Sequence, residues 1–338
     1  MKCVKIVDKK KLEVGEIDKP VSCDDKVIIK VESCGICGSD IHNWDLGEPK
    51  GLVMGHEFAG TVVDSGFSDF NIGDRVTGLP ISPCLECDAC KTGNFQYCKK
   101  TWNDAIGLST NNPGGFGEYV SVRSDMVKKL PDNVTFDEAS MVEPASVALH
   151  AVNLADVKVG DKVLIVGGGI IGLLSAEFAK MNGASYVCLL ETNEARGNKA
   201  IELGIVDEYL NALDNSIVAN MLEKSDGGFD KVIECCGNSG AVTEAIMGCK
   251  PGGDVILVGV SVTNVSIPLV VAVMSEVKLQ GSIAYTEQEF EKVIELLGDK
   301  KIDVLKYIDA KVGLDDVQLS FERLTSGKDD AIKIVVKP

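Results

Sequence analysis

The feature that most constrains this chain is a run of glycines placed between an apolar strand and a helix. Gly167-Gly168-Gly169-Ile170-Ile171-Gly172 fits the spacing G-x-G-x-x-G and directly follows the short apolar run 163–166. Glu191 lies 19 residues past the last glycine, where the next predicted strand ends. The pattern alone is weak, but a strand before it, a helix after it and an acid at this distance together predict a βαβ unit that binds a dinucleotide.

Each part of this unit has a physical task. Gly167 permits the tight turn, Gly169 lets a pyrophosphate approach the backbone, and Gly172 allows close packing of helix and strand. The carboxylate of Glu191 accepts hydrogen bonds from both ribose hydroxyls and repels a 2′-phosphate, which favours NAD over NADP. The alternative is a glycine-rich turn with a chance acid. Further contacts to the cofactor are predicted at Ile171, Arg196, Val258, Gly259 and Ser282.

The pattern of apolar runs divides the chain into a β-rich first part and a second part in which strands and helices alternate. Up to about residue 150, short β-type runs alternate with Gly, Pro and Asp, for example at 27–32, 57–63 and 75–79. From Gly160 on, apolar runs at 163–166, 186–190, 229–235 and 254–259 alternate with helical segments at 170–181 and 194–203. This alternation predicts a parallel sheet with right-handed crossovers. Two amphipathic helices are predicted at 287–298 and 314–327, and a last strand at 331–336.

Composition excludes several classes of partner. The 338 residues suffice for two domains. A net charge of −17 disfavours nucleic acid and anionic membrane surfaces. We find no signal peptide and no apolar stretch of the length that spans a bilayer. Twelve cysteines without a secretory signal indicate a reducing compartment, so we expect a cytoplasmic protein whose clustered cysteines bind metal.

One cysteine cluster has the spacing of a closed metal site. The cysteines are separated by two, two and seven residues in a polar loop: Cys84, Cys87, Cys90 and Cys98. Four thiolates leave no open position on a tetrahedral Zn²⁺, so this site is predicted to be structural. An iron–sulfur cluster is the main alternative. A nucleic-acid-binding zinc knuckle is another, and the charge of the chain weighs against it.

A second set of ligand types is spread over three segments: 34–42, with Cys37, Ser39 and His42; Gly55-His56-Glu57; and Glu143-Pro144. A catalytic zinc needs about three protein ligands and one open position. It acts as a Lewis acid that lowers the pKa of a bound alcohol. Taken singly these residues are not diagnostic, since a lone histidine such as His56 is more often packed or exposed than ligating.

Taken together, the motifs resemble one family over essentially the whole length. They are 34–42, GHEFAG at 55–60, GDRV at 73–76, the four-cysteine lobe, GFGEYV at 115–120, VEPASVALH at 142–150, the glycines at 167–172, and 281–285. In this order they are similar to the zinc-containing medium-chain dehydrogenase/reductase family, and within it to sorbitol, butanediol and related polyol dehydrogenases.

The resemblance implies roles for individual residues. Cys37 and His56 match the first two ligands of the catalytic zinc, and Glu57 matches the acid beside the metal, which ligates directly or through water. Glu143 stands where ethanol-type members have a second cysteine, which is the pattern of sorbitol-like members. Ser39 matches the hydroxyl that takes the substrate proton, and His42 the residue that relays it toward solvent.

The resemblance also implies the architecture. Residues 1–148 are expected to form a GroES-like β-barrel catalytic domain with the zinc lobe at about 84–98. Residues 149–283 are expected to form a doubly wound Rossmann domain, and 284–338 to return to the catalytic domain. Two zinc ions per chain, NAD, and a homodimer or homotetramer are implied.

The function predicted from all of this is the interconversion of a secondary alcohol, diol or polyol and its ketone with NAD. Within the family, a threonine or polyol-phosphate dehydrogenase is the alternative, although the segment 281–285 resembles butanediol dehydrogenases slightly more. A non-catalytic NAD-binding protein and a zinc-independent quinone or enoyl reductase are further alternatives. The first usually has lost ligands, and the second lacks both metal sets.

Overall fold

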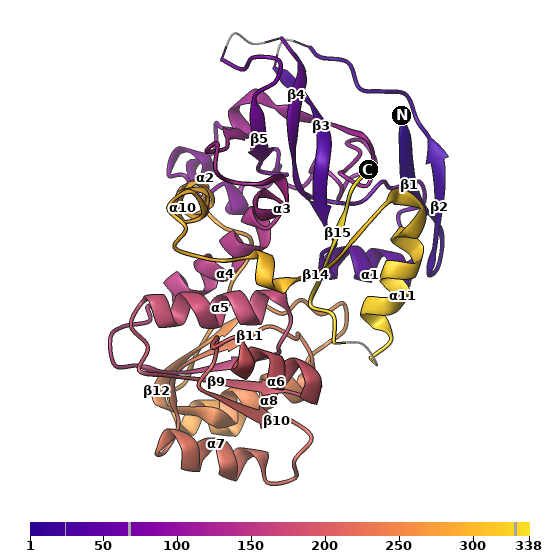
Figure 1. The fold of residues 1–338 in the computed structure, drawn as a ribbon. Helices are drawn as coiled ribbons and strands as arrows, with labels where there is room; N and C mark the ends of the chain where they lie inside the picture. The colour runs from indigo at the N-terminus through magenta and orange to yellow at the C-terminus, as the bar shows by residue number, and fades with distance from the viewer. Residues whose placement is uncertain (24, 67–68, 328–329) are drawn as a thin grey trace. The chain divides into compact units, whose positions relative to one another are not determined.

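The computed structural model describes residues 1–23, 25–66, 69–327 and 330–338. The chain divides into two compact units (Figure 1). Unit 1 comprises Met1–Pro144 and Tyr285–Pro338, and unit 2 is the intervening segment Ala145–Ala284. The described residues contain no helix with the length and apolar character needed to cross a membrane.

Unit 2 is built on a six-stranded parallel sheet. Its strands are β8 (Lys162–Val166), β9 (Tyr186–Glu191), β10 (Glu208–Asn211), β11 (Phe229–Glu234), β12 (Cys249–Leu257) and β13 (Lys278–Gly281). Their order across the sheet is β10-β9-β8-β11-β12-β13, and all five neighbouring pairs are parallel. The predicted parallel sheet is therefore confirmed. The direction of strand succession reverses between β8 and β11, and such a reversal opens a crevice at the carboxyl ends of the strands.

The central strands of this sheet are apolar because both of their faces are covered. Leu164 and Val166 of β8 pack in one buried cluster with Leu190 of β9 and Val232 of β11. The connecting helices are α5 (Ile170–Met181), α6 (Glu194–Glu202), α7 (Ile217–Ser225), α8 (Ser239–Gly248) and α9 (Leu269–Met274). Figure 1 shows α5 and α7 on opposite sides of the sheet, as right-handed crossovers in opposite directions require.

Unit 1 is dominated by antiparallel strands. A seven-stranded sheet contains β3 (Lys26–Gly35), β4 (Glu57–Ser65), β5 (Arg75–Gly78), β6 (Tyr119–Arg123), β7 (Val127–Lys129), β14 (Ile308–Val312) and β15 (Lys333–Val336). Strands β1 (Lys2–Asp8) and β2 (Lys11–Glu16) form a separate hairpin. The helices are α1 (Gly38–Leu46), α2 (Asp88–Lys91), α3 (Phe136–Ala139), α4 (Val142–Ala155), which runs on into unit 2, α10 (Glu287–Gly298) and α11 (Val317–Thr325).

The C-terminal segment completes the sheet of unit 1. Strand β15 pairs antiparallel with β3, and Phe321 of α11 packs against Trp44 and Phe116, with ring centroids 5.7 and 6.1 Å away. Asp137 accepts hydrogen bonds from Ser33 and from Lys337, the residue that follows β15. Apolar packing and charge pairing thus bind the end of the chain to its beginning.

Candidate functional site

The register of two antiparallel strands creates the first site. Gly35 at the end of β3 pairs with Glu57 at the start of β4. Cys37, two residues past Gly35, and His56, just before Glu57, therefore lie at the same end of the strand pair. The ligand atoms of Cys37, His56 and Glu57 all lie within 4.8 Å of one another. The structure brings together three of the residues predicted to surround the catalytic zinc.

The unsatisfied polar atoms of this cluster fit a metal ion. His56 and Glu57 are buried, yet His56 Nδ1 and Glu57 Oε1 have no hydrogen-bond partner among the described residues. Buried polar atoms in native proteins are almost always paired. His56 Nδ1 faces Asp40 Oδ1 at 3.6 Å, so Glu57 Oε1 is the orphaned atom that indicates an absent ligand. A thiol, an imidazole and a carboxylate are the donor types that zinc takes in catalytic sites.

Asp40 is a member of this site that the sequence analysis missed. It lies in the first turn of α1 and is fully buried, and its Oδ2 accepts the backbone N–H of Cys37 at 2.9 Å. Its Oδ1 lies 3.6 Å from His56 Nδ1. A carboxylate in this place orients a ligating imidazole and fixes its tautomer. Its position three residues after Cys37, as a capping acid of α1, was the available signal.

Lys333 is a second missed residue, and it comes from the C-terminal strand. Its ammonium group donates to Glu57 Oε2 and, at 2.8 Å, to the carbonyl oxygen of Ile36, and both side chains of the ion pair are buried. A Cβ atom on Gly35 would lie 2.0 Å from Glu57 Oε2 and 2.7 Å from Lys333 Cε, so a larger residue there would displace the ion pair. Nothing in the local sequence of β15 marks this lysine as part of the site.

Glu143, in the first turn of α4, belongs to the same neighbourhood but not to the closest group. Burial raises the pKa of Glu143 to about 7, with His56 opposing the shift and Glu57 adding to it. The Tyr285 hydroxyl is close enough to lower the same pKa. These couplings place Glu143 beside the cluster, and its role as a zinc ligand stays a prediction.

Ser39 and His42 both lie on α1, directly after Cys37, which is the N-cap residue of that helix. They are three positions apart, so their side chains share one face of the helix. Ser39 is half-buried and His42 is exposed. A path from a half-buried to an exposed polar group suits the predicted proton relay, whose roles stay predictions.

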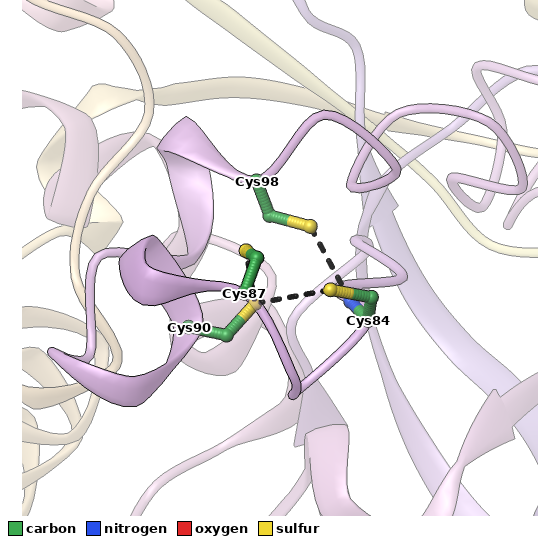
Figure 2. A group of neighbouring side chains, drawn as sticks. All are labelled: Cys84, Cys87, Cys90 and Cys98. Carbon is green, nitrogen blue, oxygen red and sulfur yellow. Dashed lines mark hydrogen bonds between the residues drawn. The ribbon is translucent and has the colours of Figure 1, made fainter.

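The four cysteines of the lobe converge as their spacing predicted (Figure 2). The sulfur atoms of Cys84, Cys87, Cys90 and Cys98 all lie within 4.8 Å of one another. Cys98 Sγ accepts the backbone N–H groups of Cys84 and Lys100, both at 3.4 Å. Backbone N–H groups aimed at Cys84 lower the pKa of that thiol to about 6. Donors directed at sulfur favour thiolates, the form that binds metal, so this donor set fits a closed zinc site.

The glycines of unit 2 adopt the turn that their spacing predicted. Gly167 has φ of 103° and donates its N–H to the carbonyl of Leu190, which joins the turn to the next strand. A Cβ atom on Gly172 would lie 1.9 Å from the carbonyl oxygen of Gly167. Gly169 is the N-cap residue of α5, and Ile171 lies in the first turn of that helix. The helix N-terminus is thereby open to an anionic group.

Glu191 closes one side of this crevice. Its Oε2 accepts the N–H of Gly168 at 2.6 Å, and its Oε1 accepts the N–H groups of Thr192 and Asn193 at 2.7 and 2.8 Å. Three backbone donors hold the carboxylate at the predicted ribose position. A cavity of about 230 Å³ opens beside it. No lysine or arginine is among the described residues that line this cavity, so Arg196 does not contribute to its wall.

The loops after β11 and β12 are held together by Glu234, which the sequence analysis also missed. Its carboxylate accepts the N–H groups of Cys236 and Gly237, and its carbonyl accepts those of Val258 and Gly259. Ser282 donates its N–H to the carbonyl of Leu257, which places it next to the same loops. The predicted cofactor residues of the second half of unit 2 therefore share one edge of the sheet.

Comparison with known proteins agrees with this geometry. Residues 23–132 match the family model of the alcohol dehydrogenase GroES-like domain, and residues 171–299 match that of zinc-binding dehydrogenases. A sorbitol dehydrogenase of Bombyx mori is 32% identical over 337 residues, covering 96% of this chain and 95% of that protein.

Solved structures agree as well. The structure of 2R,3R-butanediol dehydrogenase from Bacillus subtilis matches with a TM-score of 0.88 and 31% identity over 100% of this chain and 99% of that one. A protein of Sinorhizobium meliloti 1021 whose structure holds NADP matches with a TM-score of 0.89 and 29% identity over the same shares of the two chains.

The fold and both metal-ligand sets define a zinc-type dehydrogenase. The chain belongs to the zinc-containing medium-chain dehydrogenase/reductase family and is an oxidoreductase of the alcohol and polyol dehydrogenase type. The predicted combination of a GroES-like domain with a Rossmann-type parallel sheet is confirmed.

We expect the substitution Lys333→Met to destabilise unit 1 by about 3–5 kcal/mol, because it leaves the carboxylate of Glu57 buried without its counter-charge. Thermal and urea unfolding of the full chain measure the loss. The control is Lys30→Met, which removes a half-exposed lysine from β3 and should cost less than about 1 kcal/mol. Equal stability of the two variants would show that the buried ion pair does not support the site.

Proposed function

We propose that this protein oxidises a secondary alcohol, diol or polyol to the ketone with NAD⁺, and catalyses the reverse reduction. The convergence of Cys37, His56 and Glu57, in which Glu57 Oε1 is buried without a partner among the described residues, is the observation that carries the proposal. A structural or regulatory protein on the same fold has no need of such a group. The names of the sorbitol and butanediol dehydrogenases to which the chain is similar support this class of substrate.

In the proposed active site, Cys37, His56 and Glu143 hold zinc, with Glu57 beside it as a direct or water-mediated ligand. When bound, zinc supplies a Lewis acid that lowers the pKa of the alcohol. Asp40 orients the imidazole of His56, and Lys333 holds one oxygen of Glu57. The Ser39 hydroxyl accepts the substrate proton, because a hydroxyl can accept and donate in one step, and His42 passes it toward solvent.

We propose NAD as the preferred cofactor, with the pyrophosphate at the N-terminus of α5. Glu191 and Glu244 both line the cavity of unit 2, and a 2′-phosphate there would meet carboxylates with no cation on the lining. Like charges across such an interface cost several kcal/mol. The Sinorhizobium protein with bound NADP shows that this fold also accepts the phosphorylated cofactor. The negative charge of the cavity lining is therefore the basis for proposing NAD rather than NADP.

The proposal of a particular substrate within this class rests on one short segment. The segment 281–285 favours a vicinal diol of the butanediol type, and sugar alcohols are the next candidates. Threonine and polyol phosphates remain the alternative within the family. One or two side chains decide such a pocket, so direct measurement must distinguish these substrates.

We also propose the domain limits 1–148, 149–283 and 284–338. The protein is proposed to be cytoplasmic and to form a homodimer or homotetramer. Strand β13 supports self-association, because it is the last strand of its sheet and its residues are exposed. Nearby apolar side chains, Val270, Val273 and Met274 of α9, are 76, 64 and 81% exposed. An exposed edge with an apolar surface beside it is typical of a face that another chain covers.

A screen of alcohols with both cofactors tests the proposed reaction. We expect reduction of NAD⁺ with butane-2,3-diol stereoisomers or with sugar alcohols such as sorbitol and xylitol. Catalytic efficiency with NADP⁺ should be lower by about 10-fold or more, since 1.4 kcal/mol corresponds to a factor of ten. Threonine and polyol phosphates serve as the comparison set. Absence of turnover with every alcohol, in zinc-loaded protein that binds NADH, would refute the proposed activity.

Elemental analysis should find two zinc ions per chain. Cys37→Ser should lose one zinc and nearly all turnover with the fold retained, because the group around Cys37 leaves an open position. Cys90→Ser should unfold or aggregate, because the closed site supports the lobe. Cys23→Ser, which removes an exposed thiol outside both groups, is the control and should keep two zinc ions. One metal per wild-type chain, or iron in place of zinc, contradicts this assignment.

Ser39→Ala should reduce kcat by ~10²–10⁴-fold with zinc and NADH still bound, as expected for loss of a general acid–base group. His42→Ala should cost at most ~10²-fold, because water can replace the exposed outer step. Ser39→Thr keeps the hydroxyl and is the matched control. Full activity of the alanine variant at position 39 would mean that the proton leaves by another path.

A further inference from the structure

The cavity of unit 2 is bounded on one side by α8. It lies beside the carboxyl ends of β8 and β9 and against the first turns of α8. Its volume of about 230 Å³ suits a purine base. Its lining includes Glu191 at one side, the apolar residues Ala212 and Leu213, and Ala241 and Glu244 of α8.

Glu244 is the unpaired acid of this lining. It is half-buried, and among the described residues its carboxylate makes no hydrogen bond and no ion pair. Burial alone raises the pKa of Glu244, and no cation offsets it. Glu191 differs, because backbone N–H groups already occupy both of its oxygens. The cavity therefore has one carboxylate held by the backbone and one that can accept a hydrogen bond from a ligand.

The topology decides which part of a dinucleotide would face this wall. Strand order reverses between β8 and β11, and a dinucleotide lies across that point with its pyrophosphate at the start of α5. The acid after the second strand, Glu191, takes the ribose of the adenosine half. The base beyond that ribose would then enter the cavity, with its faces against apolar side chains and an edge toward α8.

The edge of adenine offers Glu244 one suitable partner. The ring nitrogens N1, N3 and N7 are acceptors, and a carboxylate repels them. The exocyclic N6 amino group is the donor. A 6-oxopurine carries a carbonyl oxygen at that place, and its N1–H is one ring position away, so the base would have to shift to use it.

We propose that Glu244 accepts a hydrogen bond from the N6 amino group of adenine and makes this cofactor site selective for adenine over 6-oxopurine dinucleotides. The inference rests on the proposed use of a nicotinamide dinucleotide and adds the residue that recognises its base. A hydrogen bond to a charged acceptor is among the stronger polar contacts, and half-burial of Glu244 protects it in part from water.

Equilibrium binding to the full-length, zinc-loaded protein tests this assignment. The probes are NADH and reduced nicotinamide hypoxanthine dinucleotide, in which an oxygen replaces the 6-amino group, and nicotinamide fluorescence or calorimetry gives each Kd. Wild type should bind NADH about 10-fold more tightly, the lower end expected for a charge-assisted hydrogen bond. Glu244→Gln, whose amide can also donate to the oxygen, should bring the two Kd values within about 2-fold.

Two further variants separate recognition from a general loss of binding. Glu244→Ala should weaken NADH by about 10-fold and leave the hypoxanthine dinucleotide unchanged or tighter. Glu202→Gln removes an exposed acid at the end of α6 and should keep the wild-type preference. Equal affinity of wild type for both probes, or an unchanged preference in Glu244→Gln, would overturn the role of Glu244 alone. Failure of folded wild type to bind either dinucleotide would overturn the proposed function and this inference with it.

Discussion

The buried ion pair between Lys333 and Glu57 is the contact on which the architecture of unit 1 most depends. A carboxylate removed from water costs several kcal/mol unless a counter-charge and further hydrogen bonds replace its solvation. Lys333 supplies both, because it pairs with Glu57 and also donates to the carbonyl of Ile36, one residue before Cys37. The last strand of the chain thereby holds two of the three segments that form the metal cluster.

The same requirement explains why the C-terminal segment returns to unit 1. Strand β15 can deliver Lys333 only by pairing with β3, and the pairing places Val335 opposite Gly35. A side chain on residue 35 would displace the ion pair, because Glu57 and Lys333 occupy the space beside Gly35. The sheet register brings Lys333 to Glu57, and Gly35 leaves the space that their ion pair occupies.

Unsatisfied polar atoms distinguish the two kinds of site in this protein. In the four-cysteine lobe, backbone N–H groups already point at sulfur, and the ligand set is complete in itself. At the open metal site, Glu57 Oε1 is buried without a partner among the described residues, and the half-buried Glu244 lines the cavity of unit 2. A closed structural site needs only its ion, whereas an open site leaves groups that substrate or cofactor must satisfy. The residues that bind substrate or cofactor are therefore expected where polar groups lack partners within the protein.

Local patterns were enough to predict much of the molecule. Helix α5 has the predicted bounds, because the glycine turn starts it and its apolar period continues to Met181. The predicted helix 314–327 is instead a short 3₁₀ turn at Leu314–Asp316 followed by α11, which ends at Thr325. The strands β10 and β13 were not predicted, because each has only four residues and lacks a continuous apolar run.

The sequence by itself determined the dinucleotide turn, the closed cysteine lobe and the ligand types of the open metal site. Each depends on residue identity at short spacing, where the covalent chain keeps the partners close together. Tertiary structure alone decided that Lys333 pairs with Glu57, that Asp40 faces His56 and that Glu244 lines the cavity of unit 2. Those contacts depend on sheet register and helix packing, which join residues far apart in the chain and leave no periodic signal in the sequence.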